Sequence, residues 1–301
     1  MKNLFYLFFA LSLTSCVDKK NNLTDAQGLN LNGDVKSVHV YEFDIEEKFG
    51  EEVEINVVLK DYILFNELGN KTENITPLIS DTLVCKSEYD NNNNEVLFLT
   101  YYKKTNELSD STIRIYDDEK LIKALSYDKE GNLKSTTHSK YDKNGNRIEW
   151  ARYDKDGNLD YLAKDYIYDE SSNLIEYSDY NEEGKLNQVY KYKYDDGGNI
   201  LDYSRYFSNG NLSIKMKFNK NGKQAEVKFL DLEGNVTTEE KYDENGNIVN
   251  RKFYFDSHIS ETNYTYLEFD EKQNWTRRHE IKKGGALGSR KKYSKREVRY
   301  Y

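Results

Sequence analysis

The sequence predicts an all-β fold: an antiparallel up-and-down meander of repeated hairpins that forms a curled, largely single-layer sheet, either a half-pipe or an open barrel. Three observations carry this prediction. A short phrase of tyrosine, aspartate, glycine and asparagine recurs along the chain, its copies follow one another at nearly constant spacing, and the residues between them are poor in apolar side chains. A repeat of this kind fixes the architecture before any single residue is considered.

The repeated phrase has the chemistry of a hairpin turn. The aspartate or asparagine that opens the turn can accept backbone N–H groups two residues further on, and glycine adopts positive φ at little cost. A type I turn followed by a left-handed glycine joins two antiparallel strands through a bulge. Clear copies begin at Tyr127, Tyr141, Tyr153 and Tyr242, and looser ones at Tyr168, Tyr180, Tyr194, Tyr206, Phe218 and Leu230.

The spacing of the phrase predicts one strand and one turn per unit. Successive copies from Tyr127 to Tyr242 lie 12 or 14 residues apart, apart from an interval of 15 between Tyr153 and Tyr168. Lengthening a strand by two residues keeps every side chain on its face, whereas a change of one residue reverses the faces. We therefore expect a bulge or a change of face between Tyr153 and Tyr168.

The composition predicts one layer rather than a packed two-layer core. Charged residues make up 32% of the chain and apolar residues, with tyrosine counted among them, 37%. One strand alternates cleanly, with Leu212, Ile214, Met216 and Phe218 on the same face. About a dozen strands at a spacing of ~4.8 Å would make a sheet roughly 60 Å wide, and sheets of that width curl or close.

The start of the chain predicts export and lipid anchoring. Residues 1–15 have a basic start and a short apolar run that is typical of a signal peptide. Leu13, Thr14, Ser15 and Cys16 resemble the lipobox of bacterial lipoproteins, which implies cleavage before Cys16 and lipidation of its thiol. We expect residues 16–27 to be the lipidated cysteine and a polar tether, and residues 28–301 to be one continuous repeat domain, clearest over 127–254.

The repeat is similar to the YD repeats of Rhs-type proteins, in which long meanders spiral into a shell. The match covers roughly residues 85–275. The chain more closely resembles the short YD-repeat lipoproteins of Gram-negative bacteria, through the closing segment from Phe269 to Trp275 and a final strand that ends at Tyr301. Function is mostly unknown in that group, so the resemblance implies architecture and an outer-membrane location, facing either the cell surface or the periplasm.

No motif predicts catalysis, a metal site or a cofactor. The four histidines, His39, His138, His258 and His279, stand apart from one another and from the cysteines. The segment from Asp154 to Asp160 has either of two interpretations, a calcium loop or a hairpin turn, and glycine at its fourth position rather than its sixth favours the turn. We expect no enzyme activity, and an acidic exported chain is not expected to bind nucleic acid.

Tyrosine supplies the candidate ligand-binding residues. The chain has 27 tyrosines, and a tyrosine ring suits both sugar stacking and protein contacts. Phrase-start tyrosines are expected to stack across strands. Those away from phrase starts, represented by Tyr161, Tyr177 and Tyr203, are the better candidates for an exposed, ligand-binding ladder.

The C-terminal segment is basic. Residues 276–301 contain ten Lys or Arg and two Glu. Two interpretations stay open: an anion-binding edge for phosphate-bearing lipids or acidic glycans, and a final edge strand guarded by cations against unwanted pairing.

Together these features favour a membrane-anchored, non-enzymatic binding or scaffold lipoprotein that presents a tyrosine-rich β-repeat surface to a glycan or protein partner. The alternative is a structural or immunity-type protein that cups one specific protein partner in the cell envelope. The two functions can be distinguished, because soluble glycans would compete for a glycan-binding surface and would not compete for a surface that encloses one specific protein.

Overall fold

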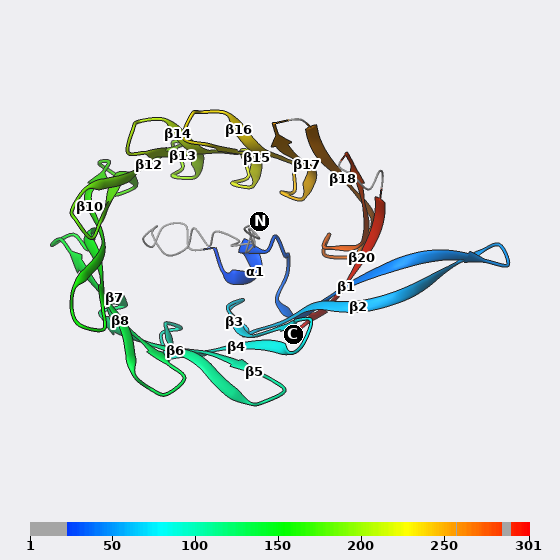
Figure 1. Cartoon of the computed structure of the whole chain (residues 1–301), viewed down its shortest axis with the longest axis horizontal. Helices are drawn as coiled ribbons and strands as arrows, with labels where there is room; N and C mark the ends of the chain where they lie inside the picture. Colours follow the sequence, from blue (N-terminus) through cyan, green and yellow to red (C-terminus); the bar gives the residue numbers. More distant parts are fainter. Residues whose placement is uncertain (1–22, 257, 285–289) are drawn as a thin grey trace.

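The computed structural model describes residues 23–256, 258–284 and 290–301, and the predicted lipidation site Cys16 lies outside these residues. They form one short helix and a single antiparallel sheet of 20 strands (Figure 1). Each strand pairs with the next along the chain, as the meander predicted. No helix among the described residues is long and apolar enough to span a membrane.

The elements run in this order: α1 (Asp25–Gly28), β1 (Val35–Lys48), β2 (Glu51–Phe65), β3 (Lys71–Pro77), β4 (Thr82–Tyr89), β5 (Glu95–Tyr102), β6 (Glu107–Asp117), β7 (Lys120–Asp128), β8 (Leu133–Tyr141), β9 (Arg147–Asp154), β10 (Leu159–Tyr168), β11 (Leu174–Asn181), β12 (Leu186–Tyr194), β13 (Ile200–Phe207), β14 (Leu212–Phe218), β15 (Gln224–Leu230), β16 (Val236–Tyr242), β17 (Ile248–Phe255), β18 (His258–Phe269), β19 (Trp275–Lys283) and β20 (Arg290–Tyr300).

The sheet closes into a full barrel, and the expectation of a half-pipe or open barrel is wrong. β1 pairs antiparallel with β20 along most of its length, from Val35 opposite Tyr300 to Phe43 opposite Tyr293. The ring in Figure 1 therefore has no break between the first and last strands of the meander. Closure pairs backbone groups that an open sheet would leave exposed at its two edges. β20 is consequently not an edge strand.

The turns have the predicted structure. In the turn that opens at Asp128, the amide of Gly131 donates to the carbonyl of Asp128, and Gly131 has a φ of 80°. One carboxylate oxygen of Asp128 accepts the amides of Glu130 and Asn132 at 3.0 and 2.8 Å. The aspartate thus pairs donors that the tight turn leaves without strand partners.

The interval of 15 residues contains the predicted irregularity. The pairing of β10 with β11 shifts between Lys164 and Ile167, and Asp165 between them has a φ of 59°. A residue in the left-handed region inside a strand is the mark of a bulge. The extra residue is therefore absorbed locally, and the turns on either side keep their geometry.

The inner wall of the barrel is the apolar wall. α1 lies within the ring, and Val38, Ile63 and Phe65 pack with it (Figure 1). Residues that are directly opposite each other in neighbouring strands lie on the same face of the sheet. Following such pairs from Val38 through β20 and back along the sheet leads to Met216 and Tyr203. Both are buried in a second cluster. Side chains converge on the concave face of a curved sheet, so one layer can bury large residues without a second sheet.

The N-terminal segment crosses one end of the barrel. The Ala26 amide donates to the carbonyl of Gly69 at 2.9 Å, in the turn between β2 and β3. Further along, the Asn30 side chain donates to Asn247 at 3.0 Å, in the turn between β16 and β17. These turns belong to widely separated hairpins. Helix α1, which lies mostly on the N-terminal side of position 28, is thus part of the packed domain.

Candidate binding surfaces

The three candidate tyrosines lie on the inner wall, and the expectation that they form an exposed ladder is wrong. Tyr203 is 1% exposed and Tyr177 is 5% exposed, and both belong to the second apolar cluster. Tyr161 packs on the edge of that cluster. The concave curvature brings these rings together, as in the stack of Tyr177 on Tyr190, whose centroids are 4.2 Å apart. That any of them binds a ligand stays a prediction.

A buried carboxylate holds two of the inner tyrosines in place. Asp179 is 1% exposed, and one of its oxygens accepts the hydroxyls of Tyr161 and Tyr190, each at 2.7 Å. Burial, helped by the Asp179 charge, raises the pKa of both phenols above the ordinary value. The two phenols therefore stay protonated and act as donors, which suits a structural role in the wall.

The proposed calcium segment is a hairpin turn. The Asp154 carboxylate accepts the amides of Asp156 and Asn158 and the side-chain amide of Asn158, at 2.8 to 2.9 Å. These donors occupy the oxygens that a cation would need. Among the described residues, no group of three or more His, Cys, Asp or Glu side chains is placed to hold a metal ion.

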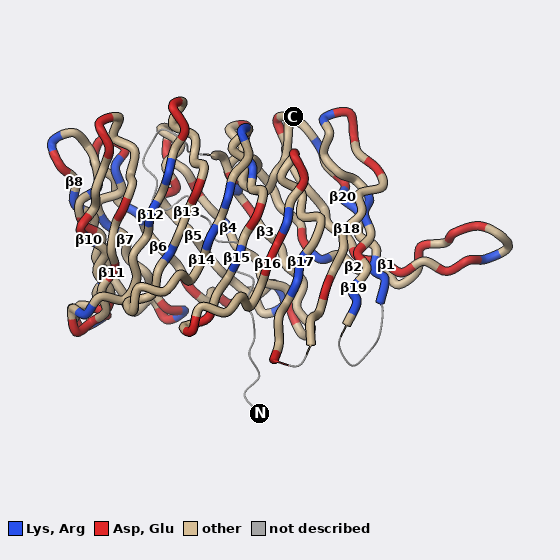
Figure 2. The backbone as a smooth tube through the Cα atoms, turned by 90° about the horizontal axis from the view of Figure 1, so that it is seen from above, with Lys and Arg blue, Asp and Glu red and all other residues tan. Residues whose placement is uncertain are grey.

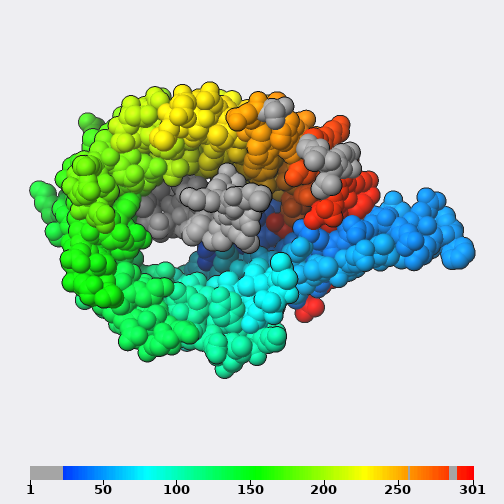
Figure 3. Space-filling model, in the orientation of Figure 1, coloured from blue at the N-terminus to red at the C-terminus, as the bar shows by residue number. Residues whose placement is uncertain are grey.

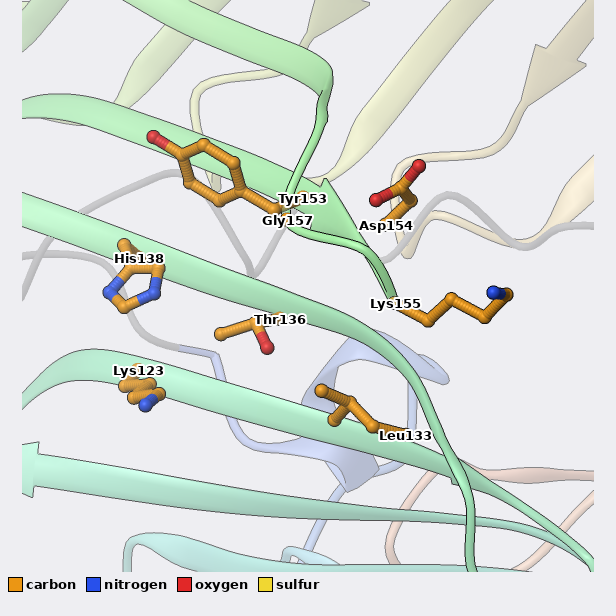
Figure 4. Close-up of a pocket in the computed structure, with 8 residues that line it drawn as sticks. All are labelled: Lys123, Leu133, Thr136, His138, Tyr153, Asp154, Lys155 and Gly157. Atoms are coloured by element: carbon orange, nitrogen blue, oxygen red, sulfur yellow. The ribbon is translucent and has the colours of Figure 1, made fainter.

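A shallow depression lies on the outer wall beside this turn. It encloses about 290 Å³ between β7, β8 and the end of β9. His138 and Thr136 line it from β8, and Tyr153 from β9 (Figure 4). The His138 ring meets the Tyr153 ring edge-on at 5.7 Å. Lys123, opposite His138 in the pairing, adds a cation at the rim. The depression combines an aromatic edge with several hydrogen-bonding groups.

A projecting hairpin is the second surface that stands out. The pairing of β1 with β20 ends at Phe43, and the pairing of β2 with β3 begins at Tyr62. In the part of the hairpin that lies between these two residues, β1 and β2 pair only with each other. They extend away from the ring as an arm (Figures 1 and 2). We call residues 44–58 the arm. The sequence does not predict the arm, because nothing in its pattern marks where the two strands leave the sheet.

The arm is acidic and exposes apolar side chains. Residues 44–58 include six Asp or Glu and one Lys, and Figure 2 shows the acidic residues along both of its strands. At its tip, Phe49 is 107% exposed relative to an extended reference, while Val57 and Val58 are about half exposed. Phe49 thus leaves a large apolar side chain open to solvent at the end of an acidic, projecting hairpin.

The basic C-terminal strands face the base of this arm. On the outer side, Lys295 contacts Glu54 at 2.6 Å and Arg277 contacts the same carboxylate at 3.7 Å. Lys292 contacts Glu42 at 3.3 Å. Part of the basic segment is thus neutralised by the acidic hairpin, which the sequence alone did not reveal because some 240 residues separate the partners.

Comparison with known proteins gives no family. No family model matches the chain, and no curated protein matches it. A porin-like protein from Bacteroides uniformis aligns with 89% of this chain and 99% of its own, at 12% identity and a TM-score of 0.38. The crystal structure of TcdB2-TccC3-Cdc42 aligns with 79% of this chain and 15% of that chain, at 11% identity and a TM-score of 0.33. With both scores below 0.5, neither likeness assigns a fold family. The chain's own turns and strands make it a β-repeat protein.

Proposed function

We propose that this protein is a short YD-repeat lipoprotein, anchored at the outer membrane through Cys16, whose barrel is a non-enzymatic scaffold that holds the arm out to a protein partner. The observation that carries the proposal is the arm itself. A lone two-stranded hairpin is marginally stable in water, so the barrel at its base serves to keep it extended. Its free backbone edges can also accept a strand from a partner.

The partner that fits the arm is a protein with an apolar patch ringed by lysine or arginine. Phe49 supplies an aromatic anchor of the type that dominates binding energy at interfaces. The surrounding carboxylates of Glu46, Glu47, Glu51 and Glu52 would steer a basic surface toward it. Complementarity of charge thus argues for a basic partner and against a second acidic copy of this chain, whose basic residues Arg277, Lys292 and Lys295 already contact Glu42 and Glu54.

Site-specific photocrosslinking in the producing cell tests this. A photoreactive amino acid at Phe49 is expected to give one discrete protein adduct, and the same amino acid at Ile115, which is 40% exposed on the wall, is expected to give none. After purification of that partner, Phe49→Ser should weaken binding at least tenfold, the range of an aromatic hot spot. No adduct from position 49, or equal adducts from both positions, would refute the arm as the binding element.

A glycan is the second candidate ligand, favoured by the outer-wall depression. The exposed edge of Tyr153 with Thr136, His138 and Lys123 around it offers stacking and hydrogen bonds of the kind that suit a sugar. If a glycan array detects binding, Tyr153→Ala should abolish it and Ile148→Ala, at another exposed position on the barrel, should not. Equal binding by both variants would place the glycan elsewhere.

The anchor has its own test. Replacing Cys16 with alanine should move the protein from the membrane fraction to the soluble fraction and leave the barrel folded. Protease digestion of the tagged protein on intact cells would put the barrel on the surface, whereas protection until permeabilisation would put it in the periplasm. An unchanged membrane association of Cys16→Ala would contradict lipidation at this residue.

A further inference from the structure

Two arginines on neighbouring strands share one tryptophan ring. The guanidinium carbon of Arg296 in β20 lies 3.9 Å from the centroid of the Trp275 ring, and that of Arg278 in β19 lies 4.6 Å from it. Arg278 also lies 5.2 Å from the Tyr264 ring in β18. Guanidinium groups stack well on aromatic faces, so the two cations are held close together by the ring that both contact.

Both arginines face the lumen. In β20, Arg296 alternates with Val298 and Tyr300, which pack on the apolar cluster around α1. Arg278 is directly opposite Ser294, which stands two residues before Arg296 on the same face. Figure 1 shows α1 inside the ring, and the space-filling view in Figure 3 shows an opening through it. Both arginines are only partly buried on this wall.

The pair makes none of the ion pairs that Lys295 and Arg277 make, although Glu280 lies on the same face, opposite Tyr264. Lys295 and Arg277, on the outer side of the same two strands, are paired with Glu54. Among the residues that the structure describes, neither Arg278 nor Arg296 makes an ion pair. The Nε of each is also buried without a hydrogen-bond partner. A buried donor without a partner is costly and calls for an acceptor.

The charge of Arg296 persists at neutral pH. Burial, together with the charge of Arg278, lowers the pKa of Arg296 to about 9, which leaves the guanidinium protonated near pH 7. Two like charges on one ring raise the local positive potential, and the aromatic face offsets only part of their repulsion. An anion between them would satisfy the donors and relieve that repulsion together.

We propose that Arg278, Arg296 and Trp275 form an anion-binding site on the lumen wall that takes the phosphate group of a small phosphate monoester. Two fixed positive charges match a dianion better than a carboxylate, and guanidinium groups present several N–H donors in the planar arrangement that phosphate oxygens accept. Ser294 is directly opposite Arg278, and the Tyr264 ring contacts Arg278, so both residues border the same place. This site is separate from the arm and does not depend on the arm's binding partner.

Calorimetry on the full-length lipidated protein in detergent tests the site, with inorganic phosphate and glucose 6-phosphate as probes and acetate as the monoanion. Saturable binding of one phosphate per chain is expected, at least tenfold weaker in Arg278→Gln and Arg296→Gln and unchanged in Arg299→Gln, which removes an exposed arginine of the same strand. Acetate should bind at least tenfold more weakly than phosphate. Tighter binding of glucose 6-phosphate than of inorganic phosphate would identify an esterified ligand, and the reverse would identify free phosphate.

Thermal unfolding separates a binding role from a structural one. Phosphate should raise the melting temperature of the wild type and of Arg299→Gln, and should leave that of the two inner variants unmoved. Each of the two inner variants removes one of two like charges, so the unliganded barrel should stay folded. Near-ultraviolet circular dichroism of the tryptophans checks this. No saturable phosphate binding to the wild type, equal binding in all variants, or equal binding of acetate would each overturn the proposal.

Discussion

At the scale of single residues, the turn glycines share one backbone conformation but differ in what surrounds them. Gly69 has a φ of 79°, and a Cβ added there would lie 2.8 Å from the Thr24 hydroxyl oxygen. Gly210 has a φ of 85° with nothing within 4 Å of its added Cβ. Thr24 caps α1 by accepting the Gln27 amide. The β2–β3 turn therefore supports the N-terminal segment as well as the hairpin.

Replacing these two glycines with alanine should separate the two roles. In both variants, alanine in the left-handed conformation should lower the free energy of unfolding by roughly 1–2 kcal/mol. Gly69→Ala should lose more stability than Gly210→Ala, because Thr24 must move. Urea denaturation measures the difference. Hydrogen exchange at the Ala26 amide, which donates to Gly69, should speed up in Gly69→Ala and not in Gly210→Ala. Equal exchange in the two variants would show that the turn does not hold the segment.

Residue-level prediction succeeded where chemistry was local and failed where it depended on curvature. The Asp154 turn could be predicted because its glycine, aspartate and asparagine act on one another within five residues. The burial of Tyr203 could not be predicted from its distance to a phrase start. Register supplied the missing signal: Tyr203 is directly opposite Met216, whose face the sequence had marked as apolar. The outer-wall depression is formed by three neighbouring strands, and the Arg278–Arg296 pair by two. Neither feature can be predicted before those strands are placed side by side.

At the scale of elements, phrase tyrosines tie strand ends together. At one end of the barrel, a tyrosine at or near the end of an even-numbered strand donates its hydroxyl to a backbone carbonyl at the start of the preceding strand. The pairs are Tyr89 with Lys71, Tyr116 with Glu95, Tyr141 with Leu121, Tyr168 with Arg147, Tyr194 with Leu174, and Tyr266 with Ile248, at 2.7 to 3.0 Å. We call this set the tyrosine ladder. It gives a role to the tyrosine that opens the copies at Tyr141, Tyr168 and Tyr194, because phenylalanine lacks the donating hydroxyl.

The ladder should make stability fall in alkali. Burial, with a smaller effect of the Asp169 charge, raises the pKa of Tyr194 to about 12, above the ordinary value near 10. A raised folded pKa means that the contribution is complete below about pH 10 and is lost as the pH rises toward 12. Tyr194→Phe should cost about 1 kcal/mol at pH 7 through the lost hydrogen bond.

Urea midpoints at pH 7, 9 and 11 measure this effect. Between pH 9 and 11 the wild type should lose stability faster than Tyr194→Phe, by at most about 1 kcal/mol because the ring is only partly shielded from solvent. Tyr102→Phe, at an exposed tyrosine outside the ladder, serves as the control and should follow the wild type. A Tyr194→Phe slope that equals that of the wild type would show that this phenol does not titrate with unfolding.

The prediction of elements was good where the phrase repeats and incomplete elsewhere. Strands from β7 to β17 lie between copies of the phrase, and the bulge at Asp165 followed from one odd interval. About a dozen strands were expected from those copies, and the sheet has 20. The additional strands are joined partly by other turns, such as the one between β5 and β6, where Asn106 has a φ of 53° without glycine. A search for the phrase does not detect turns of that kind.

At the scale of the whole molecule, closure is the property that sequence could least predict. The pairing of β1 with β20 joins segments at opposite ends of the chain, and its register carries no local signal. It follows from the accumulated curvature of every hairpin between them. The same closure brings the acidic β1–β2 hairpin against the basic β19 and β20, so that Glu54 meets Lys295. The basic end of the chain thus lies within a continuous wall, where Lys292 and Lys295 are paired with acidic residues of the β1–β2 hairpin and Arg278 and Arg296 stack on Trp275.

A disulfide across the seam tests whether the ring is closed in solution. Val38 and Val298 are directly opposite each other in β1 and β20, so cysteines at both positions should oxidise readily. Loop-closure entropy predicts a gain of about 5 kcal/mol for a cross-link that spans most of a chain and about 3 kcal/mol for one that spans a single hairpin. Cysteines at Ile113 and Leu125, directly opposite each other in β6 and β7, supply the hairpin-sized control. The increase in urea midpoint on going from the reduced to the oxidised protein should therefore be larger for the seam disulfide than for the control disulfide. If the seam cysteines stay reduced while the control pair oxidises, the two ends do not meet and the protein is an open half-pipe; if both disulfides form and the seam gains more, the first and last strands are paired in solution and the ring is closed.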